Sequence, residues 1–413
     1  MIMCIKRINI PITVLMLLFS ASACSNPAAV NTDADLTEHK EGQAAARDLA
    51  ASNEKPAFST KMIATFDEPW AMTALPTANN APPKLLVTQK TGELFVVDTS
   101  TGTKTAVTGV PKVAYGGQGG LGDIVLAPDF ATSKHIYLSY AEAGTGSDKG
   151  KLGAKVIRAT LMGLDTDAPS LQAVMPIWEQ VPKVRGQGHY SHRLLLSPDD
   201  QYLYISSGDR QKKDPAQDMT VNLGKIIRLN LDGSIPNDNP FVGDTSIDSM
   251  AAQFWTLGHR NVLGMVFDQS GMLWAHEMGP RGGDELNLIE KGKNYGWPLV
   301  SNGRNYSGTD IPDHDTRPEF AAPYITWTPV ISPSSMSVYS SGRYDDFPAW
   351  QGNALISGLS STALIVVDLA DDATHERYRY DMGERIRSVL AVDGQVWLVE
   401  DGEGAQLLQL QPK

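Results

Sequence analysis

The residue types best suited to chemistry gather between Leu257 and Pro298, in segments that read LGHRN, HEMGPRGGDELN and NYGWP. The Gly-Pro-Arg-Gly-Gly segment exposes main-chain carbonyl groups, because Pro280 has no N–H and glycines permit tight turns. Calcium takes oxygen ligands at about 2.3 to 2.6 Å, and Glu285 places a carboxylate nearby in the sequence. Composition alone favours an ordinary polar loop here, with calcium binding as the alternative.

A second candidate segment is GHYSHR, which contains His189 and His192. Histidine has an unperturbed pKa of about 6.5 and suits proton removal near neutrality. Taken alone, His189 is equally well explained as a surface or hydrogen-bonded residue. A zinc pair with His192 is disfavoured, because side chains three residues apart on a strand point to opposite faces.

These segments must be positioned by β-structure. Beyond residue 60, short β-rich runs alternate with clusters of Gly, Pro, Asn and Asp, and no long segment has a helical period. Several strands follow a turn, such as APDF, SPDD, DQSG or VDG, whose residues preset or tolerate turn conformations. The clearest expected strands are 85–88, 93–97, 135–140, 202–206, 272–275, 354–357, 364–368 and 396–399.

A turn-then-strand unit that recurs roughly six times at unequal spacing indicates an all-β, six-bladed β-propeller, because radial stacking covers both faces of each sheet. A two-sheet sandwich is the alternative fold. We predict that residues 59–413 form this domain.

The N-terminus carries two basic residues, an apolar run and then SASAC, which indicates an export signal. The run is short for a membrane span of about 20 residues. The small residues before Cys24 resemble the bacterial lipoprotein cleavage box, so we predict a signal segment at 1–24 with Cys24 acylated. A plain signal peptide is the alternative. Residues 25–58 contain few large apolar side chains and are predicted to form a flexible tether.

Charge and cysteine content exclude some classes of protein. The 413 residues include 35 Lys plus Arg and 47 Asp plus Glu, for a net charge of -12. A nucleic-acid partner is therefore not expected. Both cysteines, Cys4 and Cys24, lie in the predicted signal segment, so the rest of the chain has no disulfide framework.

The order and spacing of the motifs resemble the soluble PQQ-dependent glucose and aldose sugar dehydrogenases. LGHRN is followed, eighteen residues after its Asn, by Gly-Pro, and then by DELN and NYGWP. The resemblance implies that Arg260 and Asn261 contact the quinone and that carbonyl groups of Gly279 and Pro280 hold calcium. Glu285 and Tyr295 match positions that bind a second, structural calcium in some members.

Further motifs extend the resemblance from Phe66 to Leu410. GQGGL suggests Gln118 as a cofactor contact, and the segment GHYSHR with the later SGD makes His189 the catalytic base. Gln217, ahead of LGKIIRLNLDGSIP, resembles another cofactor contact. Tyr324 and Trp327 match an aromatic wall, and Arg385 and Arg387 match arginines that bind the quinone carboxylates, which suits arginine's planar fork.

The resemblance implies an oxidoreductase that uses PQQ and Ca²⁺ to oxidise the anomeric carbon of aldose sugars to lactones and passes electrons to an external acceptor. The predicted location is the periplasm, with a lipid anchor, on the outer membrane. The alternatives are a non-catalytic propeller that binds carbohydrate or protein, and a calcium-dependent lactonase. The chain departs from the family near Ser360, where members often carry a lysine, and at Gly188 and His192.

Overall fold

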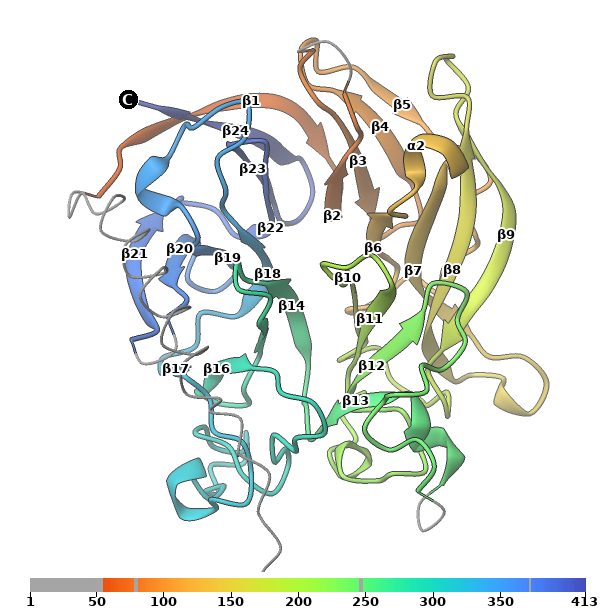
Figure 1. The fold of residues 1–413 in the computed structure, drawn as a ribbon, viewed down its shortest axis with the longest axis vertical. Coiled ribbons are helices and arrows are strands. Elements are labelled where there is room, and N and C mark those ends of the chain that lie inside the picture. The colour runs from red at the N-terminus through yellow and green to blue at the C-terminus, as the bar shows by residue number, and fades with distance from the viewer. Residues whose placement is uncertain (1–54, 78–80, 245–247, 371–372) are drawn as a thin grey trace, which may run out of the picture. The chain divides into compact units, whose positions relative to one another are not determined.

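The computed structural model describes residues 55–77, 81–244, 248–370 and 373–413. Within these ranges the chain forms six four-stranded antiparallel sheets arranged as a ring around a central channel (Figure 1). This confirms the predicted all-β, six-bladed propeller. The predicted signal segment, Cys24 and most of the predicted tether lie outside the described residues.

The first five blades add strands outward from the channel in sequence order, and the sixth takes its outermost strand from the start of the described chain. The first blade contains β2 (Pro69–Ala74), β3 (Lys84–Gln89), β4 (Leu94–Asp98) and β5 (Lys104–Ala106); the second, β6 (Leu121–Leu126), β7 (His135–Ala143), β8 (Leu152–Met162) and β9 (Ser170–Glu179); the third, β10 (Ser191–Leu196), β11 (Tyr202–Ser207), β12 (Lys225–Asn230) and β13 (Phe254–Leu257). The fourth contains β14 (Val262–Phe267), β15 (Leu273–Glu277), β16 (Asp284–Leu288) and β17 (Ile325–Trp327); the fifth, β18 (Pro333–Val338), β19 (Ala354–Gly358), β20 (Ala363–Asp368) and β21 (His375–Asp381); the sixth, β22 (Ile386–Val392), β23 (Gln395–Glu400), β24 (Ala405–Pro412) and β1 (Phe58–Phe66).

In the part of the chain that the structure describes, helices are few and short. They are α2 (Phe130–Ser133) and the 3-10 turns η1 (Gly146–Asp148), η2 (Asp214–Ala216), η3 (Ser249–Gln253), η4 (His314–Thr316) and η5 (Pro348–Trp350). In the described ranges, no helix has the length and apolar character needed to cross a membrane.

The ring is closed by the sixth blade, which joins the two ends of the described chain. β1 is its outermost strand and pairs antiparallel with β24, from Phe58 opposite Pro412 to Phe66 opposite Ala405. This pairing covers the outer edge of β24, which would otherwise expose unpaired backbone groups.

Six apolar clusters hold the blades together, one at each junction between neighbours. The junction between the sixth and first blades buries Phe66 and Trp397 against Leu85 and Val87, for example. Each sheet therefore buries both faces against its neighbours, which a single blade cannot do alone. The stacking fixes where the ends of the inner strands lie.

The six inner strands share an irregularity that matters for function. In each, the register against the second strand shifts at the N-terminal end: 69/71, 121/124, 191/194, 262/264, 333/335 and 386/388. Bulges of this kind break the pairing and redirect side chains, and they are common beside active sites. One mouth of the channel is thus lined by re-aimed residues from every blade.

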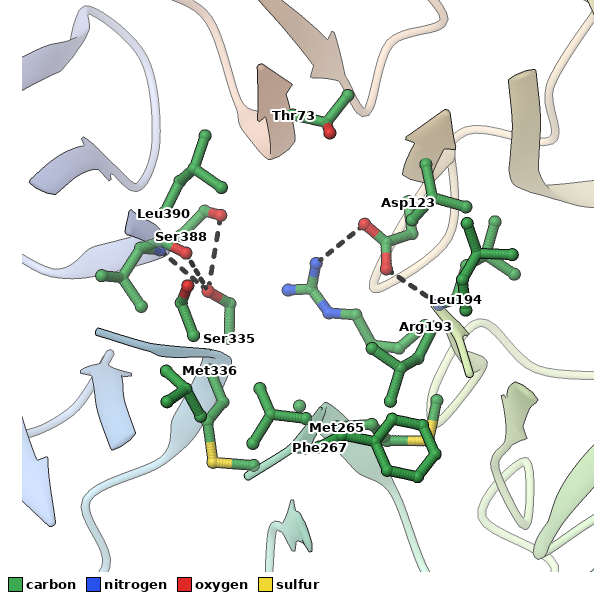
Figure 2. A pocket seen from close by; sticks show the side chains of 18 of the residues that line it. Thr73, Asp123, Arg193, Leu194, Met265, Phe267, Ser335, Met336, Ser388 and Leu390 are labelled. Carbon is green, nitrogen blue, oxygen red and sulfur yellow. Dashed lines mark hydrogen bonds and ion pairs between the residues drawn. The ribbon is translucent and has the colours of Figure 1, made fainter. Parts of the chain in front are cut away.

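The opposite half of the channel forms a cavity of about 500 Å³ lined by all six inner strands. Figure 2 shows Arg193 of β10 pointing into this space, with Asp123 beside it and Ser335 and Ser388 across the channel. Arg193 donates to the carbonyl groups of Leu263 and Ser334 at 2.7 Å each, and lies 3.4 Å from Asp123. Its guanidinium also stacks on Trp70, 3.7 Å from the ring centre. One side chain therefore connects five blades.

Candidate functional site

The mouth formed by the N-terminal ends of the inner strands contains two cavities. The first, of about 430 Å³, is lined by residues that include Gln118, Asn261, Arg385 and Arg387. The second, of about 410 Å³, is lined by residues that include His189, Asp209, Arg260, Pro280 and Trp297. Both are large enough for a small organic ligand. The fold thus gathers most of the predicted site residues at one mouth of the channel.

His189 lies in the loop before β10 and is held from two sides. Its Nδ1 is 2.7 Å from Asp209 Oδ1, and its backbone N–H donates to Gln118 Oε1 at 2.6 Å. His189, Ser191 and His192 all have positive φ values, of 46°, 56° and 49°. Such backbone conformations cost energy and persist where the surrounding structure enforces them. The strain is concentrated on the residue that presents its imidazole to the second cavity.

Arg210 supports this loop from behind. It is almost fully buried, and its guanidinium donates to the carbonyl groups of Gly186 and Gly188 at 2.6 and 2.8 Å. Two carbonyl groups directly before His189 are therefore held in place, which fixes the path of the chain into His189.

The environment keeps His189 neutral. Burial lowers the pKa of His189 below its usual value, and the charge of Arg260 lowers it further, while the hydrogen bond to Asp209 opposes both. Burial alone would raise the pKa of Asp209, but the hydrogen bond from His189 and another from Trp297 Nε1 keep it below its usual value. An ionised Asp209 requires a proton on Nδ1 of His189. Nε2 is then the unprotonated nitrogen, as a general base requires.

Arg260 and Asn261 enter from the loop before β14 and are oriented by Glu277. One carboxylate oxygen of Glu277 accepts from the backbone N–H groups of Arg260, at 2.6 Å, and Asn261, at 3.3 Å. The other lies 2.9 Å from Nδ1 of His259. The side chain of Arg260 donates to the Met278 carbonyl at 2.9 Å, but its buried Nε has no hydrogen-bond partner among the described residues. Arg260 retains an unsatisfied donor.

The predicted calcium segment, Gly279 and Pro280, forms a tight loop between β15 and β16. A Cβ on Gly279 would lie 2.2 Å from the carbonyl oxygen of Gly283, so only glycine fits. Pro280 lines the second cavity. In the described ranges no cluster of three or more His, Cys, Asp or Glu side chains is placed to hold a metal. A calcium ion at this loop would depend on main-chain oxygens, which calcium accepts.

A small cavity lies next to this loop, lined by Glu277, Glu285 and Tyr295 among others. Burial and repulsion from Glu277 raise the pKa of Glu285 well above its usual value. The neighbouring Asn287 donates to Glu285 at 3.3 Å, but its own buried Oδ1 has no partner in the described part of the chain. Tyr295 stacks on His259, and its hydroxyl donates to the Leu288 carbonyl. Two carboxyl groups and an unsatisfied oxygen here fit a cation.

Arg385 and Arg387 line the first cavity, where both are already paired with Asp401. Arg385 Nε donates to Oδ2 at 2.8 Å, while Arg387 Nε and Nη2 donate to Oδ1 at 2.8 and 2.6 Å. Lys90 lies in the same cavity, 2.9 Å from Glu68. The three cations exceed the two carboxylates by one charge, so the wall still favours an anion.

Three of the predicted cofactor contacts do not line either of the two larger cavities. Gln217 forms reciprocal hydrogen bonds with Asn294, at 3.0 and 2.7 Å, and also donates to the Trp297 carbonyl. Trp327 is buried in the junction between the fourth and fifth blades, where its Nε1 donates to Glu376 at 3.0 Å. Tyr324 is 43% exposed and packs edge-on against Trp274. The outer position of β17 in its blade separates both aromatic residues from the channel.

The structure also places residues that the sequence did not single out. Asp209 accepts a hydrogen bond from His189. The sequence feature that could have identified Asp209 is the SGD motif after the histidine segment, which contains it. Trp297, in NYGWP, covers one side of the second cavity. Tyr306 and Lys213 complete that cavity from long loops, and Lys213 Nζ donates to Asn305 at 2.8 Å. No local pattern marks these last two residues.

Comparisons with known proteins identify the family of this chain. The family model for glucose/sorbosone dehydrogenase matches residues 66–409. Aldose sugar dehydrogenase YliI of Escherichia coli K12 is 38% identical over 356 residues, which cover 84% of this chain and 91% of that protein. The crystal structure of the apo-form of soluble aldose sugar dehydrogenase from Escherichia coli aligns with a TM-score of 0.77 at 36% identity, over 86% of this chain and 100% of that one.

A PQQ-bound aldose sugar dehydrogenase from Streptomyces coelicolor aligns with a TM-score of 0.68 at 27% identity, over 87% of this chain and 100% of that one. The chain belongs to the glucose/sorbosone dehydrogenase family.

Proposed function

We propose that this protein is a PQQ- and calcium-dependent dehydrogenase that oxidises the anomeric carbon of aldose sugars to lactones and delivers the electrons to an external acceptor. The observation that supports this most is the His189–Asp209 pair at 2.7 Å in a cavity shared with Arg260 and Trp297. Related proteins are named as sugar dehydrogenases, and one solved relative is PQQ-bound.

His189 supplies the proton transfer. With Nδ1 donating to Asp209, Nε2 takes the proton of the sugar's anomeric hydroxyl, and the Asp209 carboxylate stabilises the imidazolium that results. Arg210 and Gln118 hold the loop so that this nitrogen stays in the cavity. Trp297 offers an apolar face on which a sugar ring can pack, and its Nε1 fixes Asp209 at 2.8 Å.

The first cavity and its border fit an anionic, planar cofactor. Arg385, Arg387 and Arg260 would bind carboxylates, and Gln118 and Asn261 would supply hydrogen bonds. The buried Nε of Arg260, which has no hydrogen-bond partner among the described residues, would be free to donate to such a carboxylate. When bound, PQQ would accept the hydride, and calcium would act as a Lewis acid that polarises it. The cations of Lys90, Arg385 and Arg387 compensate for the absence of a lysine near Ser360.

Two positions fit calcium. Carbonyl groups of Gly279 and Pro280 would hold the ion beside the cofactor. Glu285 with Tyr295 would hold a structural ion in the small cavity, where a cation would relieve the repulsion between Glu285 and Glu277.

The test is a dye-reduction assay on purified protein with PQQ and Ca²⁺ and a panel of aldoses. We expect reduction that depends on all three, and loss of at least about 100-fold in His189→Ala. The exposed His375 provides the matched control, because we expect His375→Ala to leave the rate of dye reduction unchanged. Quinone binding without turnover of any aldose would instead indicate a binding propeller. Lactone hydrolysis that needs Ca²⁺ but no quinone would indicate a lactonase.

We also propose that the chain is exported and lipid-anchored through Cys24. Cells expressing the full chain should place it in the membrane fraction, with a lipid mass on the N-terminal peptide, and Cys24→Ser should release it from that fraction. Equal partitioning of both proteins would contradict the anchor.

A further inference from the structure

His192 lies three residues beyond the catalytic base, and the mechanism above does not use it. Its ring is buried in the wall of the first cavity, the one lined by Gln118, Arg385 and Arg387. The ring stacks on Trp70 with centroids 4.9 Å apart and planes 10° from parallel. Its position is therefore fixed by packing.

Counting hydrogen atoms determines which nitrogen carries the proton. Ser139 Oγ accepts from the Asp123 backbone N–H at 2.8 Å and lies 2.7 Å from the carbonyl oxygen of His192, which only accepts. The single hydroxyl hydrogen of Ser139 is thus used on that carbonyl. The third contact of Oγ, 2.8 Å from His192 Nδ1, requires Nδ1 to be the donor. Nδ1 carries the proton and Nε2 carries a lone pair.

The ring cannot readily take a second proton. Burial, with the positive charges of Arg193 and Arg210, lowers the pKa of His192 to about 3. His192 is neutral throughout the range in which an enzyme of this kind operates.

The free nitrogen is accessible from the cavity. His192 lines the first cavity, and Nε2 is not among the inaccessible polar atoms that lack a hydrogen-bond partner. The Nδ1–Cε1 edge of the ring lies against Gly122, where an added Cβ would come within 2.2 Å of Nδ1 and 2.0 Å of Cε1. No hydrogen bond to Nε2 is formed by the residues that the structure describes.

We propose that His192 Nε2 is a fixed hydrogen-bond acceptor that selects for an N–H or O–H donor on the ligand in this cavity. The inference rests on the proposed function. Glu68 and Asp401 line the same cavity, but their carboxylates already accept from Lys90, Arg385 and Arg387, so His192 adds a neutral acceptor to this wall. The ligand donor belongs either to the quinone, through a ring N–H, or to the sugar, through a hydroxyl group.

Two variants separate hydrogen bonding from packing. His192→Phe keeps a flat ring on Trp70 but has no acceptor, whereas His192→Gln keeps an acceptor and gives up the stacking. The measurements are PQQ titration by absorbance with Ca²⁺ and no sugar, and the KM for an aldose. We expect His192→Phe to raise one of the two constants about fivefold to tenfold and His192→Gln to stay within about threefold of wild type. His375→Phe is the surface control.

A change in the PQQ titration assigns the donor to the quinone, and a change confined to KM assigns it to the sugar. Unchanged constants in His192→Phe, or an equal loss in both variants, would overturn the proposal while leaving the proposed function intact. A wild-type protein that takes up no quinone would overturn both together. Nitrogen NMR of the ligand-free protein gives an independent check, because a proton on Nε2 between pH 5 and 9 would also refute the inference.

Discussion

At the scale of single residues, Asp209 shows how one side chain fixes the chemistry of another. Its two oxygens accept from four donors: His189 Nδ1, Trp297 Nε1 and the backbone N–H groups of Gln211 and Lys213. A carboxylate suits this position because it only accepts. The arrangement requires the tautomer of His189 that carries its proton on Nδ1.

We therefore expect Asp209→Asn to lower kcat/KM for the aldose by about 100-fold or more. The NH₂ group of the amide must face two of the four donors. It either loses the contacts with Trp297 and Lys213, or it faces Gln211 and His189 and favours the tautomer of His189 that lacks a proton on Nδ1. Steady-state kinetics with the thermal unfolding midpoint recorded alongside would measure this. Asp165→Asn, on an exposed loop, is the control, and equal activity of both variants would show that Asp209 does not orient the base.

The pH profile follows from the same pair. Because burial and Arg260 lower the pKa of His189 below 6.5, the base stays unprotonated into mildly acidic solution. We expect kcat/KM to be flat above pH 6.5 and to fall on acidification with a single pKa below that value. Initial rates from pH 4.5 to 8 would show it. A midpoint above 6.5 would mean that Asp209 dominates the environment of His189.

At the scale of elements, the site is built from loops that rigid strands present. The loop from Gly208 to Gly224 joins β11 to β12 and carries Asp209 at its start. Lys225, at its end, is fully buried and donates to the carbonyl groups of Pro215, Ala216 and Leu223 at 2.7, 3.2 and 2.9 Å. The side-chain nitrogen of Lys225 therefore holds the two parts of the loop, around Pro215 and around Leu223, together.

Lys225→Met should lower the free energy of unfolding by about 2 to 4 kcal/mol, because it leaves buried carbonyl groups without donors. Urea unfolding would measure the difference. Lys212→Met, on the exposed part of the same loop, should stay within about 0.5 kcal/mol of wild type. Similar stabilities of the two variants would mean that water replaces the ammonium group.

The elements also explain what could be predicted from the sequence. Expected strands such as 85–88 and 354–357 correspond to β3 and β19, because second and third strands of blades are continuous apolar runs buried on both faces. The four turns that were predicted all connect a first strand to a second. Inner strands such as β10, which begins Ser-His-Arg, were missed because they carry the polar residues of the channel.

For the site, the order of the motifs predicted that His189, Arg260 and Arg385 belong to one site, and the structure places all three at one mouth of the channel. The motifs did not predict the surroundings of Trp327, because a short aromatic pattern does not reveal that β17 is the outer strand of its blade. Lys213 and Tyr306 lie on long loops whose paths depend on tertiary contacts such as the Lys213–Asn305 bond. Such contacts leave no periodic trace in a sequence.

At the scale of the whole molecule, stability depends on closing the ring. Phe66 of β1 is 2% exposed and packs in the junction between the last and first blades, while Met62 on the same strand is 57% exposed. Because every blade relies on two neighbours, loosening this junction weakens the entire ring.

Phe66→Ala should therefore lower the free energy of unfolding by about 3 to 5 kcal/mol, and Met62→Ala should change it by less than about 0.5 kcal/mol. Denaturant unfolding followed by tryptophan fluorescence and by circular dichroism would measure both. Coincident transitions are expected from a ring that unfolds as one unit. A separate early transition in Phe66→Ala would show that the closing blade detaches alone.

Arg193 lies between the two halves of the central channel. Its bonds to Leu263 and Ser334 span the channel between the half lined by apolar strand residues and the half that contains the predicted site. We expect a ligand to reach His189 through the mouth at the N-terminal ends of the inner strands, where the second cavity lies, and the oxidised sugar to leave by that mouth before an electron acceptor approaches. We expect turnover to alternate between the two partners, with parallel lines in double-reciprocal plots.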